Sequence, residues 1–321
     1  MNTEVKIAGL VMRNPFTVAS GTFASGREYT EIWRNTPSPS VPAMLPFPFD
    51  PDAPLSILGA VTTKGVSLTP WQGNDGIRIT ETASGVLNSI GLQNPGVEEF
   101  CAQDLPWLAT QKVPVIVNVS GHTSDEYIAV IERLEAEEVV EAYELNISCP
   151  NVDCGGMSFG TSVDAAAGLT AACRAHTKRP LIVKLTPNVT DITEIARACE
   201  ASGADALSLI NTVAGMAIDV RMRKAVFDRK VAGLSGPAIK PVALYAVYRV
   251  SKSVGIPIIG MGGITRVEDV VEFLLAGATA IAVGSHNFTD PLAVPHLLAG
   301  FLQWCEKEGV SDISELTRGL Q

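Results

Sequence analysis

The stretch Val113–Ser148, VPVIVNVSGHTSDEYIAVIERLEAEEVVEAYELNIS, contains one complete strand–helix–strand unit. Its two ends, 113–120 and 142–148, are largely apolar runs, which is typical of strands buried on both faces of a parallel sheet. Between them, apolar residues recur with helical period and carboxylates take the opposite face. The apolar face comprises Tyr127, Ile128, Ile131 and Leu134. A helix that joins two such strands indicates parallel pairing.

The same alternation of strand and helix continues along the whole chain. The predicted strands are Phe16–Ser20, Gly59–Lys64, Val113–Ser120, Ala142–Ser148, Leu181–Thr186, Ala206–Asn211, Ile256–Gly260 and Ala280–Gly284. The predicted helical segments include Ser124–Val139, Thr193–Ser202, Pro237–Val254 and Val267–Ala276. This pattern predicts an α/β protein with one domain over residues 1–321, a single (β/α)8 TIM barrel with a short N-terminal hairpin and inserted loops. A doubly wound open sheet is the alternative that the pattern alone leaves open.

The composition is that of a globular protein. Of the 321 residues, 46% are hydrophobic and 18% are charged, which suits a chain with a large core. The formal net charge of −10 argues against a nucleic-acid or anionic-membrane surface, because such a surface needs a basic patch. We recognise neither a signal peptide nor an apolar run long enough to span a membrane, so we expect a cytoplasmic protein.

The six cysteines are scattered and include no CxxC pair. They are Cys101, Cys149, Cys154, Cys173, Cys199 and Cys305. Zinc and iron–sulfur sites need clustered thiolates, so we expect no metal centre within this chain. If this protein works with an iron–sulfur cluster, we expect another chain to supply that cluster.

Two segments depart from the alternation. Thr36–Ser56 carries seven prolines, and because proline fixes φ and removes a backbone donor, we expect an irregular inserted loop. A surface loop packed by its own apolar residues is favoured over a functional lid. Thr212–Ser235 is too long for an ordinary connection and is rich in arginine and lysine. Long ordered connections are often functional.

Polar residues and glycines follow most of the predicted strands. In a barrel, the carboxyl ends of the strands face the active site. The residues at these ends are Ser20–Gly21, Lys64–Gly65, Asn118, Asn146–Asn151, Lys184, Asn211–Thr212, Gly262–Gly263 and Gly284–Ser285. Polar ends on most strands predict a polar ligand spread across the barrel mouth. The glycines after the last two strands suit a phosphate held by backbone N–H groups, although tight turns alone would also explain them.

Two lysines, Lys64 and Lys184, end buried strands. A buried ammonium group is costly unless it meets an anion or an electron-rich ligand. A flavin becomes anionic on reduction, and a lysine beside its pyrimidine edge would stabilise that state. A salt bridge to an acidic neighbour is the alternative for either lysine.

The most informative string is Asn146-Ile-Ser-Cys-Pro-Asn151. Asparagine both donates and accepts, which suits a ligand with adjacent C=O and N–H groups such as a pyrimidine ring. A cysteine at a strand end is usually an inert small hydrophobe. Here Pro150 ends the strand and leaves Cys149 beside the amides, which favours a functional thiol.

Several further motifs occur in a fixed order along the chain. They are Val18-Ala-Ser-Gly-Thr-Phe23, Thr63-Lys-Gly65, Leu87-Asn-Ser-Ile-Gly-Leu-Gln-Asn-Pro-Gly96, Glu144-Leu-Asn-Ile-Ser-Cys-Pro-Asn151, Val183-Lys-Leu-Thr-Pro187, Ile210-Asn-Thr212 and Leu234-Ser-Gly-Pro237. From about Ile7 to Pro291 the sequence resembles the class 1 dihydroorotate dehydrogenases. It is most similar to the NAD-linked class 1B, because Gly155–Gly156 and Phe159–Gly160 follow the cysteine motif.

The resemblance implies roles for individual residues. The FMN contacts would be Ser20, Lys64, Gly65, Asn118, Asn146, Lys184, Ile210, Gly236, Gly262, Gly263, Gly284 and Ser285. The contacts to orotate would be Lys64, Asn88, Ser89, Ile90, Gly91, Leu92, Asn146, Asn151, Asn211 and Thr212. Cys149 would be the catalytic base that removes the C5 proton of dihydroorotate while hydride leaves C6 for FMN.

In class 1B the electrons leave through a partner subunit that carries FAD and a [2Fe–2S] cluster and reduces NAD. The resemblance therefore implies a homodimer of catalytic chains at the core of a heterotetramer. Two features depart from the family pattern: Thr36–Ser56 resembles an insertion, and His286 stands where a small residue is usual. For His286, a side chain at a helix start is favoured over a contact to the flavin phosphate.

Other functions remain open from the sequence. They are a dihydropyrimidine dehydrogenase-like flavoenzyme, a class 1A enzyme that reduces fumarate, a flavin-free aldolase or isomerase using Lys184 as a Schiff-base amine, and a non-catalytic barrel.

Overall fold

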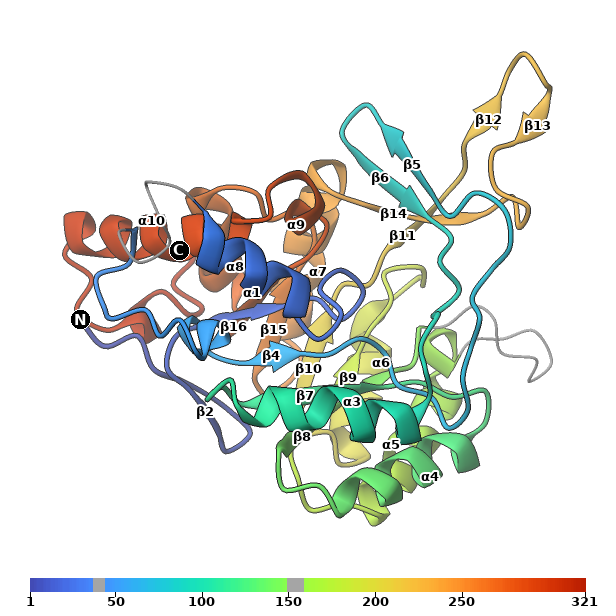
Figure 1. The fold of residues 1–321 in the computed structure, drawn as a ribbon, viewed down its shortest axis with the longest axis horizontal. Coiled ribbons are helices and arrows are strands. Elements are labelled where there is room, and N and C mark those ends of the chain that lie inside the picture. The colour runs from blue at the N-terminus through green and yellow to red at the C-terminus, as the bar shows by residue number, and fades with distance from the viewer. Residues whose placement is uncertain (37–43, 149–158) are drawn as a thin grey trace.

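The computed structural model describes residues 1–36, 44–148 and 159–321. Eight parallel strands form the central sheet in the order β3-β16-β15-β10-β9-β8-β7-β4 (Figure 1). In chain order they are β3 (Phe16–Val18), β4 (Val61–Thr62), β7 (Val115–Val119), β8 (Val140–Asn146), β9 (Leu181–Lys184), β10 (Ala206–Leu209), β15 (Ile258–Met261) and β16 (Ala280–Val283). Each lies within or overlaps one of the predicted strands.

The sheet closes into a barrel because its first and last strands also meet. The Gly59 N–H donates to the Phe16 carbonyl at 2.9 Å, and the Thr17 and Thr62 hydroxyls lie 3.1 Å apart. The predicted (β/α)8 barrel is therefore confirmed, and the open doubly wound sheet is excluded.

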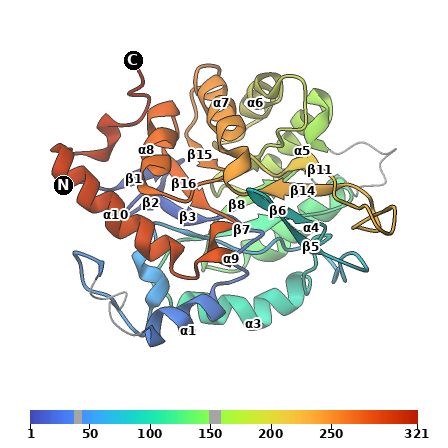
Figure 2. The same cartoon turned by 90° about the horizontal axis from the view of Figure 1, so that it is seen from above.

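Helices surround the barrel (Figure 2). They are α1 (Arg27–Asn35), α3 (Val97–Ala109), α4 (Ser124–Glu135), α5 (Val163–Ala175), α6 (Ile192–Ala201), α7 (Lys240–Ser251), α8 (Val267–Ala276), α9 (His286–Thr289) and α10 (Ala293–Glu308). In α4 the Thr123 side chain caps the helix by accepting from the Glu126 N–H. The helix ends at Glu135, before the predicted Val139. Val130 is buried and Ile128 is half-buried, so the apolar face is rotated slightly from the predicted one.

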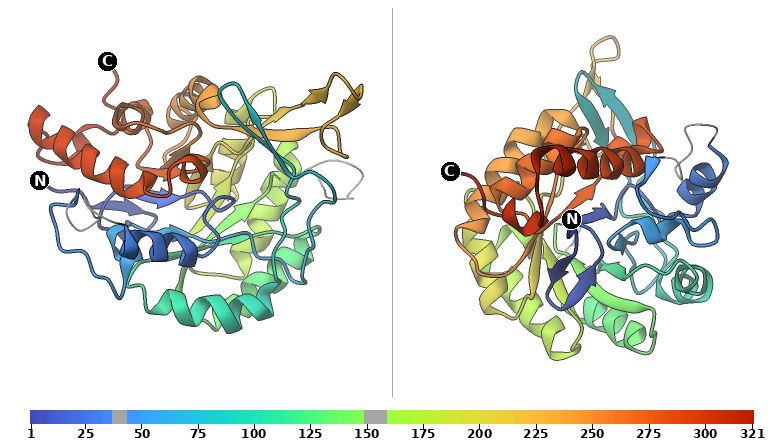
Figure 3. Two further views of the ribbon diagram at one scale, coloured as in Figure 1. Left: turned by 45° about the horizontal axis from the view of Figure 1, so that its top comes forward. Right: turned by 90° about the vertical axis from the view of Figure 1, so that its left-hand side faces the viewer.

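The N-terminal hairpin predicted from the sequence is present. It pairs β1 (Val5–Ile7) with β2 (Leu10–Met12) in antiparallel register, and both Ile7 and Met12 are fully buried in the core. Figure 3 shows this hairpin at the amino end of the barrel strands. No helix within the described ranges is long and apolar enough to cross a lipid bilayer.

A second, smaller sheet lies at the opposite end, over the carboxyl ends of the barrel strands (Figure 1). Its order is β11-β14-β6-β5, with bounds β11 (Val213–Gly215), β14 (Ala232–Ser235), β6 (Gly85–Asn88) and β5 (Ile79–Thr82). Between β11 and β14, the hairpin of β12 (Ile218–Asp219) and β13 (Lys224–Ala225) projects outward. The long connection 212–235 is therefore β-structure that joins with a hairpin from another part of the chain.

The structure describes Thr36 and residues 44–56 of the proline-rich segment 36–56. Leu45 is buried, Phe47 and Phe49 pack against the barrel core, and the Arg13 guanidinium lies 4.9 Å from the Phe47 ring centroid. A 3-10 turn over Pro54–Ile57 leads into β4. The described part of the segment therefore packs on the barrel, not only on itself.

Candidate active site

A cavity of about 1020 Å³ opens at the carboxyl ends of the barrel strands, between them and the small sheet. Every described residue of the predicted site lines it. These residues are Ser20, Lys64, Gly65, Asn88, Ser89, Ile90, Gly91, Leu92, Asn118, Asn146, Lys184, Ile210, Asn211, Thr212, Gly236, Gly262, Gly263, Gly284 and Ser285. Two predicted residues, Cys149 and Asn151, lie outside the described residues.

The two lysines lie at the wall of the cavity. Lys184 is the last residue of β9, and its Nζ donates to the Ser20 hydroxyl at 3.2 Å and lies 3.8 Å from Glu144 Oε1. Burial lowers the pKa of Lys64, and the positive charge of Lys184 lowers it further. Two lysines that share one cavity wall, Lys184 buried and Lys64 half-buried, favour an anionic or electron-rich ligand.

Three asparagines line the same wall: Asn118 near the end of β7, Asn146 at the end of β8 and Asn211 just after β10. Asn118 Nδ2 donates to Glu144 Oε1 at 2.6 Å, while its Oδ1 is buried without a hydrogen-bond partner among the described residues. Asn211 Nδ2 is 3.5 Å from Asn146 Oδ1. The Tyr127 hydroxyl fixes the backbone of Asn146 by donating to its carbonyl at 2.7 Å. The amides therefore offer both donors and acceptors to one ligand.

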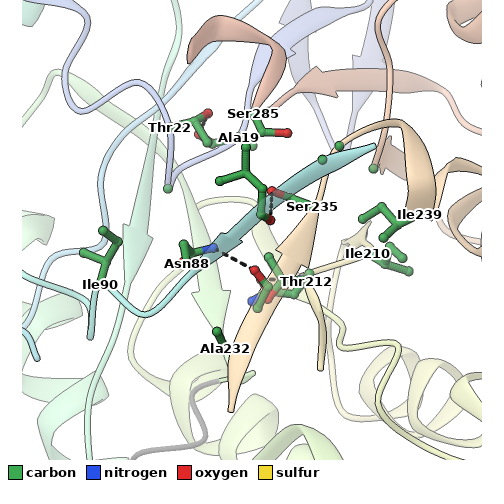
Figure 4. Close-up of a pocket in the computed structure, with 18 of the residues that line it drawn as sticks. Ala19, Thr22, Asn88, Ile90, Ile210, Thr212, Ala232, Ser235, Ile239 and Ser285 are labelled. Carbon is green, nitrogen blue, oxygen red and sulfur yellow. Dashed lines mark hydrogen bonds between the residues drawn. The ribbon is translucent and has the colours of Figure 1, made fainter. Parts of the chain in front are cut away.

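The small sheet supplies the other side of the cavity (Figure 4). Asn88 ends β6 and extends toward Thr212, and its Nδ2 donates to the Gly233 carbonyl at 3.3 Å. The loop that follows bends sharply, with positive φ at Gly91 and Leu92. Asn74 holds this loop by donating to the Ser89 carbonyl at 3.1 Å and to its hydroxyl at 3.0 Å.

The turn after β15 has room for a ligand but none for side chains. Gly262 and Gly263 have φ of +126° and +79°, which favours glycine. A Cβ on Gly263 would lie 2.8 Å from the Gly236 carbonyl oxygen and 2.9 Å from the Lys240 nitrogen. Such a turn leaves backbone exposed to a ligand at the cavity, which suits a phosphate.

His286 is the first residue of α9, as expected, and it also lines the cavity. Its Nδ1 lies 2.9 Å from the Thr289 hydroxyl. Burial lowers the pKa of His286 despite the nearby Asp290 carboxylate. The imidazole is therefore neutral near pH 7.

Sequence reasoning missed several lining residues. Asn188 donates to the Thr212 carbonyl at 2.9 Å and accepts from the Ala214 N–H at 2.8 Å, so it joins the barrel to β11. In the sequence, its position directly after the Val183–Pro187 motif could have identified Asn188 as a site residue. The contributions of β5 and of Asn74 had no signal, because they depend on the small sheet forming.

A sequence model of the dihydroorotate dehydrogenase family matches residues 51–303. The chain belongs to the dihydroorotate dehydrogenase family. Among its relatives, a protein of Lachnoclostridium phytofermentans is 50% identical over 98% of both chains. Another, from Petrotoga mobilis, is 45% identical over 100% of this chain and 99% of its own. A third, from Alkaliphilus metalliredigens, is 48% identical with the same coverage.

All three relatives are named dihydroorotate dehydrogenase B (NAD(+)), catalytic subunit. These names agree with both the family and the class 1B subtype that the sequence motifs predict. For this member of the dihydroorotate dehydrogenase family, the cavity at the barrel mouth is the candidate active site.

Proposed function

We propose that this chain is the catalytic subunit of an NAD-linked dihydroorotate dehydrogenase, which oxidises (S)-dihydroorotate to orotate in the synthesis of UMP. The observation that carries the proposal is the cavity wall, where the buried Lys184, the half-buried Lys64 and three asparagines lie together in a chain of this family. A pyrimidine carboxylate is anionic and has alternating C=O and N–H groups, so it matches this wall in charge and in hydrogen bonding.

The residues present fit FMN as the cofactor. Asn118 Oδ1 is a buried acceptor without a partner among the described residues, and it suits an imide N–H. Lys64 and Lys184 suit the pyrimidine edge. The turn of Gly262 and Gly263, together with Gly236, Gly284 and Ser285, would hold the phosphate. When bound, FMN accepts hydride from C6 of dihydroorotate.

The substrate would lie between this wall and the small sheet. We assign Asn88 and the loop Ser89–Leu92 to one side of it, and Asn146, Asn211 and Thr212 to the other. Asn74 and Asn188 keep these two sides in place through the hydrogen bonds described above. Because the small sheet covers the cavity, it would also limit the access of water.

The proposed base is Cys149, which removes the C5 proton as a thiolate. Four of the other cysteines are described, and all are buried in helices: burial raises the pKa of Cys101, Cys199 and Cys305 to about 11 and that of Cys173 to about 12. Such thiols stay protonated and inert. On either side of the segment that contains Cys149, Ser148 and Thr161 line the cavity. The residue-level resemblance names Cys149, and Asn151 as a further substrate contact.

The electrons would leave this chain for a second subunit. The names of the relatives, which specify a catalytic subunit and NAD(+), favour NAD as the final acceptor over fumarate. By resemblance, the partner would carry FAD and [2Fe–2S], and two catalytic chains would form the core of a heterotetramer.

Steady-state assays of the purified chain test the proposal. With FMN and a dye acceptor, the chain is expected to form orotate from dihydroorotate and to leave dihydrouracil unreacted. NAD reduction is expected only when the partner subunit is added. Efficient fumarate reduction by the chain alone would instead indicate class 1A, and preference for dihydrouracil would indicate the dihydropyrimidine dehydrogenase-like activity.

A further inference from the structure

Glu144 is a buried carboxylate behind the cavity wall. It lies on β8 two residues before Asn146, so the two side chains share one face of the strand. Glu144 is 2% exposed and does not line the cavity. Its two oxygens accept hydrogen bonds of 2.6 Å each, Oε1 from Asn118 Nδ2 and Oε2 from the Ser208 hydroxyl. Glu144 therefore has no direct contact with a ligand, but it holds a residue that does line the cavity.

The carboxylate also attracts Lys184. Glu144 Oε1 lies 3.8 Å from Lys184 Nζ, and the two side chains are 3% and 6% exposed. On its other side, Lys184 is held by the Ser20 hydroxyl at 3.2 Å. A buried charge without a partner is strongly destabilising. The carboxylate of Glu144 and the ammonium group of Lys184 therefore stabilise each other in the protein interior. This interaction keeps the ammonium group at the cavity wall.

Glu144 also decides which way the Asn118 amide points. A carboxylate can only accept, so Asn118 must turn its NH₂ toward Glu144. Its Oδ1 then points away from Glu144, and a Cβ on Gly65 would lie 2.9 Å from it. Asn118 and Gly65 both line the cavity. Glu144, which lies behind the wall, therefore causes the wall to present Asn118 Oδ1 as a hydrogen-bond acceptor.

We propose that Glu144 is a positioning residue for the flavin, which orients Asn118 and Lys184 and offsets the positive charge of the wall. The inference rests on the proposed function, since it assumes FMN in the cavity. Reduced flavin carries negative charge, so positive charge in the wall favours the reduced state. By offsetting the charge of Lys184, Glu144 limits that preference. A carboxylate with a purely structural role would affect unfolding but not the redox balance of the flavin.

The substitution Glu144→Gln isolates the charge, because glutamine keeps the shape and an amide oxygen that can accept from Asn118. We expect FMN to bind still, with the ratio of affinities for reduced and oxidised FMN about tenfold higher than in the wild type. For a two-electron couple this equals a rise of about 30 mV in midpoint potential. Anaerobic titration with dithionite against a reference dye measures it without dihydroorotate.

Glu135→Gln is the matched control. Glu135 ends α4, accepts from the Tyr143 hydroxyl at 3.0 Å and lies 3.9 Å from the Arg179 guanidinium, and it does not line the cavity. The same change of charge in that network is expected to leave the midpoint potential of the flavin unchanged. Thermal unfolding of both apo-variants separates a loss of stability from a change in redox balance.

A midpoint potential in Glu144→Gln that is unchanged or lower than in the wild type would overturn this inference and leave the proposed function intact. A wild-type chain that does not bind FMN would overturn both. If Glu144→Gln does not fold, Glu144→Asp tests the same point, because it withdraws the carboxylate from Lys184 by one methylene. An increase of about threefold in the affinity ratio is then expected, and an unchanged ratio again contradicts the inference.

Discussion

Gly263→Ala is expected to weaken FMN binding strongly, because the turn after β15 leaves no space for a side chain. Gly263 has a φ of +79°, and the added Cβ would lie 2.8 Å from the Gly236 oxygen and 2.9 Å from the Lys240 nitrogen. Both neighbours are backbone atoms and cannot rotate away. Gly236 itself has a φ of +100°, so the facing segment has little freedom to adapt.

The expected size of the effect follows from these contacts. A left-handed conformation costs an L-residue roughly 1–2 kcal/mol. Two backbone contacts below 3.0 Å force a further shift of the turn, which brings the total to about 3 kcal/mol. If FMN binds only to the original turn, this corresponds to a loss of affinity of about 100-fold.

The assay is a titration of apo-protein with FMN, followed by flavin fluorescence. The matched control is Gly168→Ala in α5, an exposed glycine whose added Cβ would meet no atom within 4 Å. There we expect unchanged FMN affinity and a gain in stability of about 0.5–1 kcal/mol. A Gly263→Ala variant that binds FMN within threefold of the wild type would refute the reasoning.

Two further predictions concern the reaction. Cys149→Ala should still bind FMN but oxidise dihydroorotate about 10²–10⁴-fold more slowly, and turnover like the wild type at saturating substrate would exclude Cys149 as the base. The affinity for orotate should fall as the pH rises, because only the protonated Lys64 attracts the anion. The midpoint of this loss should lie below pH 10.5, since burial and then the charge of Lys184 lower the pKa of Lys64 from that value. Orotate titrations across pH check this, and in Lys64→Met the alkaline loss should disappear.

The barrel was predictable from the sequence because its signal is local. Strands buried on both faces are short apolar runs, as in Val115–Val119, where every residue is buried. The ends of such strands meet at one side of the barrel wherever the sheet closes. The described site residues at the strand ends, such as Lys64, Asn118 and Lys184, therefore came together as expected.

The small sheet was not predictable in the same way. Its strands have only three or four residues, and β14 pairs with β6 over a separation of well over a hundred residues in the chain. Such short strands carry no clear periodicity, and their register depends on the barrel that brings them together. For the same reason Asn74 had no assigned role. Asn188 directly follows the Val183–Pro187 motif, but its contacts to Thr212 and Ala214 appear only in the folded structure. Glu144 belonged to a motif without a role of its own. Its function follows from its contacts to Asn118 and Lys184.

The most direct test of the proposed function is anaerobic mixing of the FMN-loaded chain with dihydroorotate, followed by flavin absorbance. We expect the absorbance of oxidised flavin to be lost rapidly and in proportion to the orotate formed, with dihydrouracil causing no comparable change. Flavin that stays oxidised with dihydroorotate, or that is reduced as readily by dihydrouracil, would contradict the proposed function.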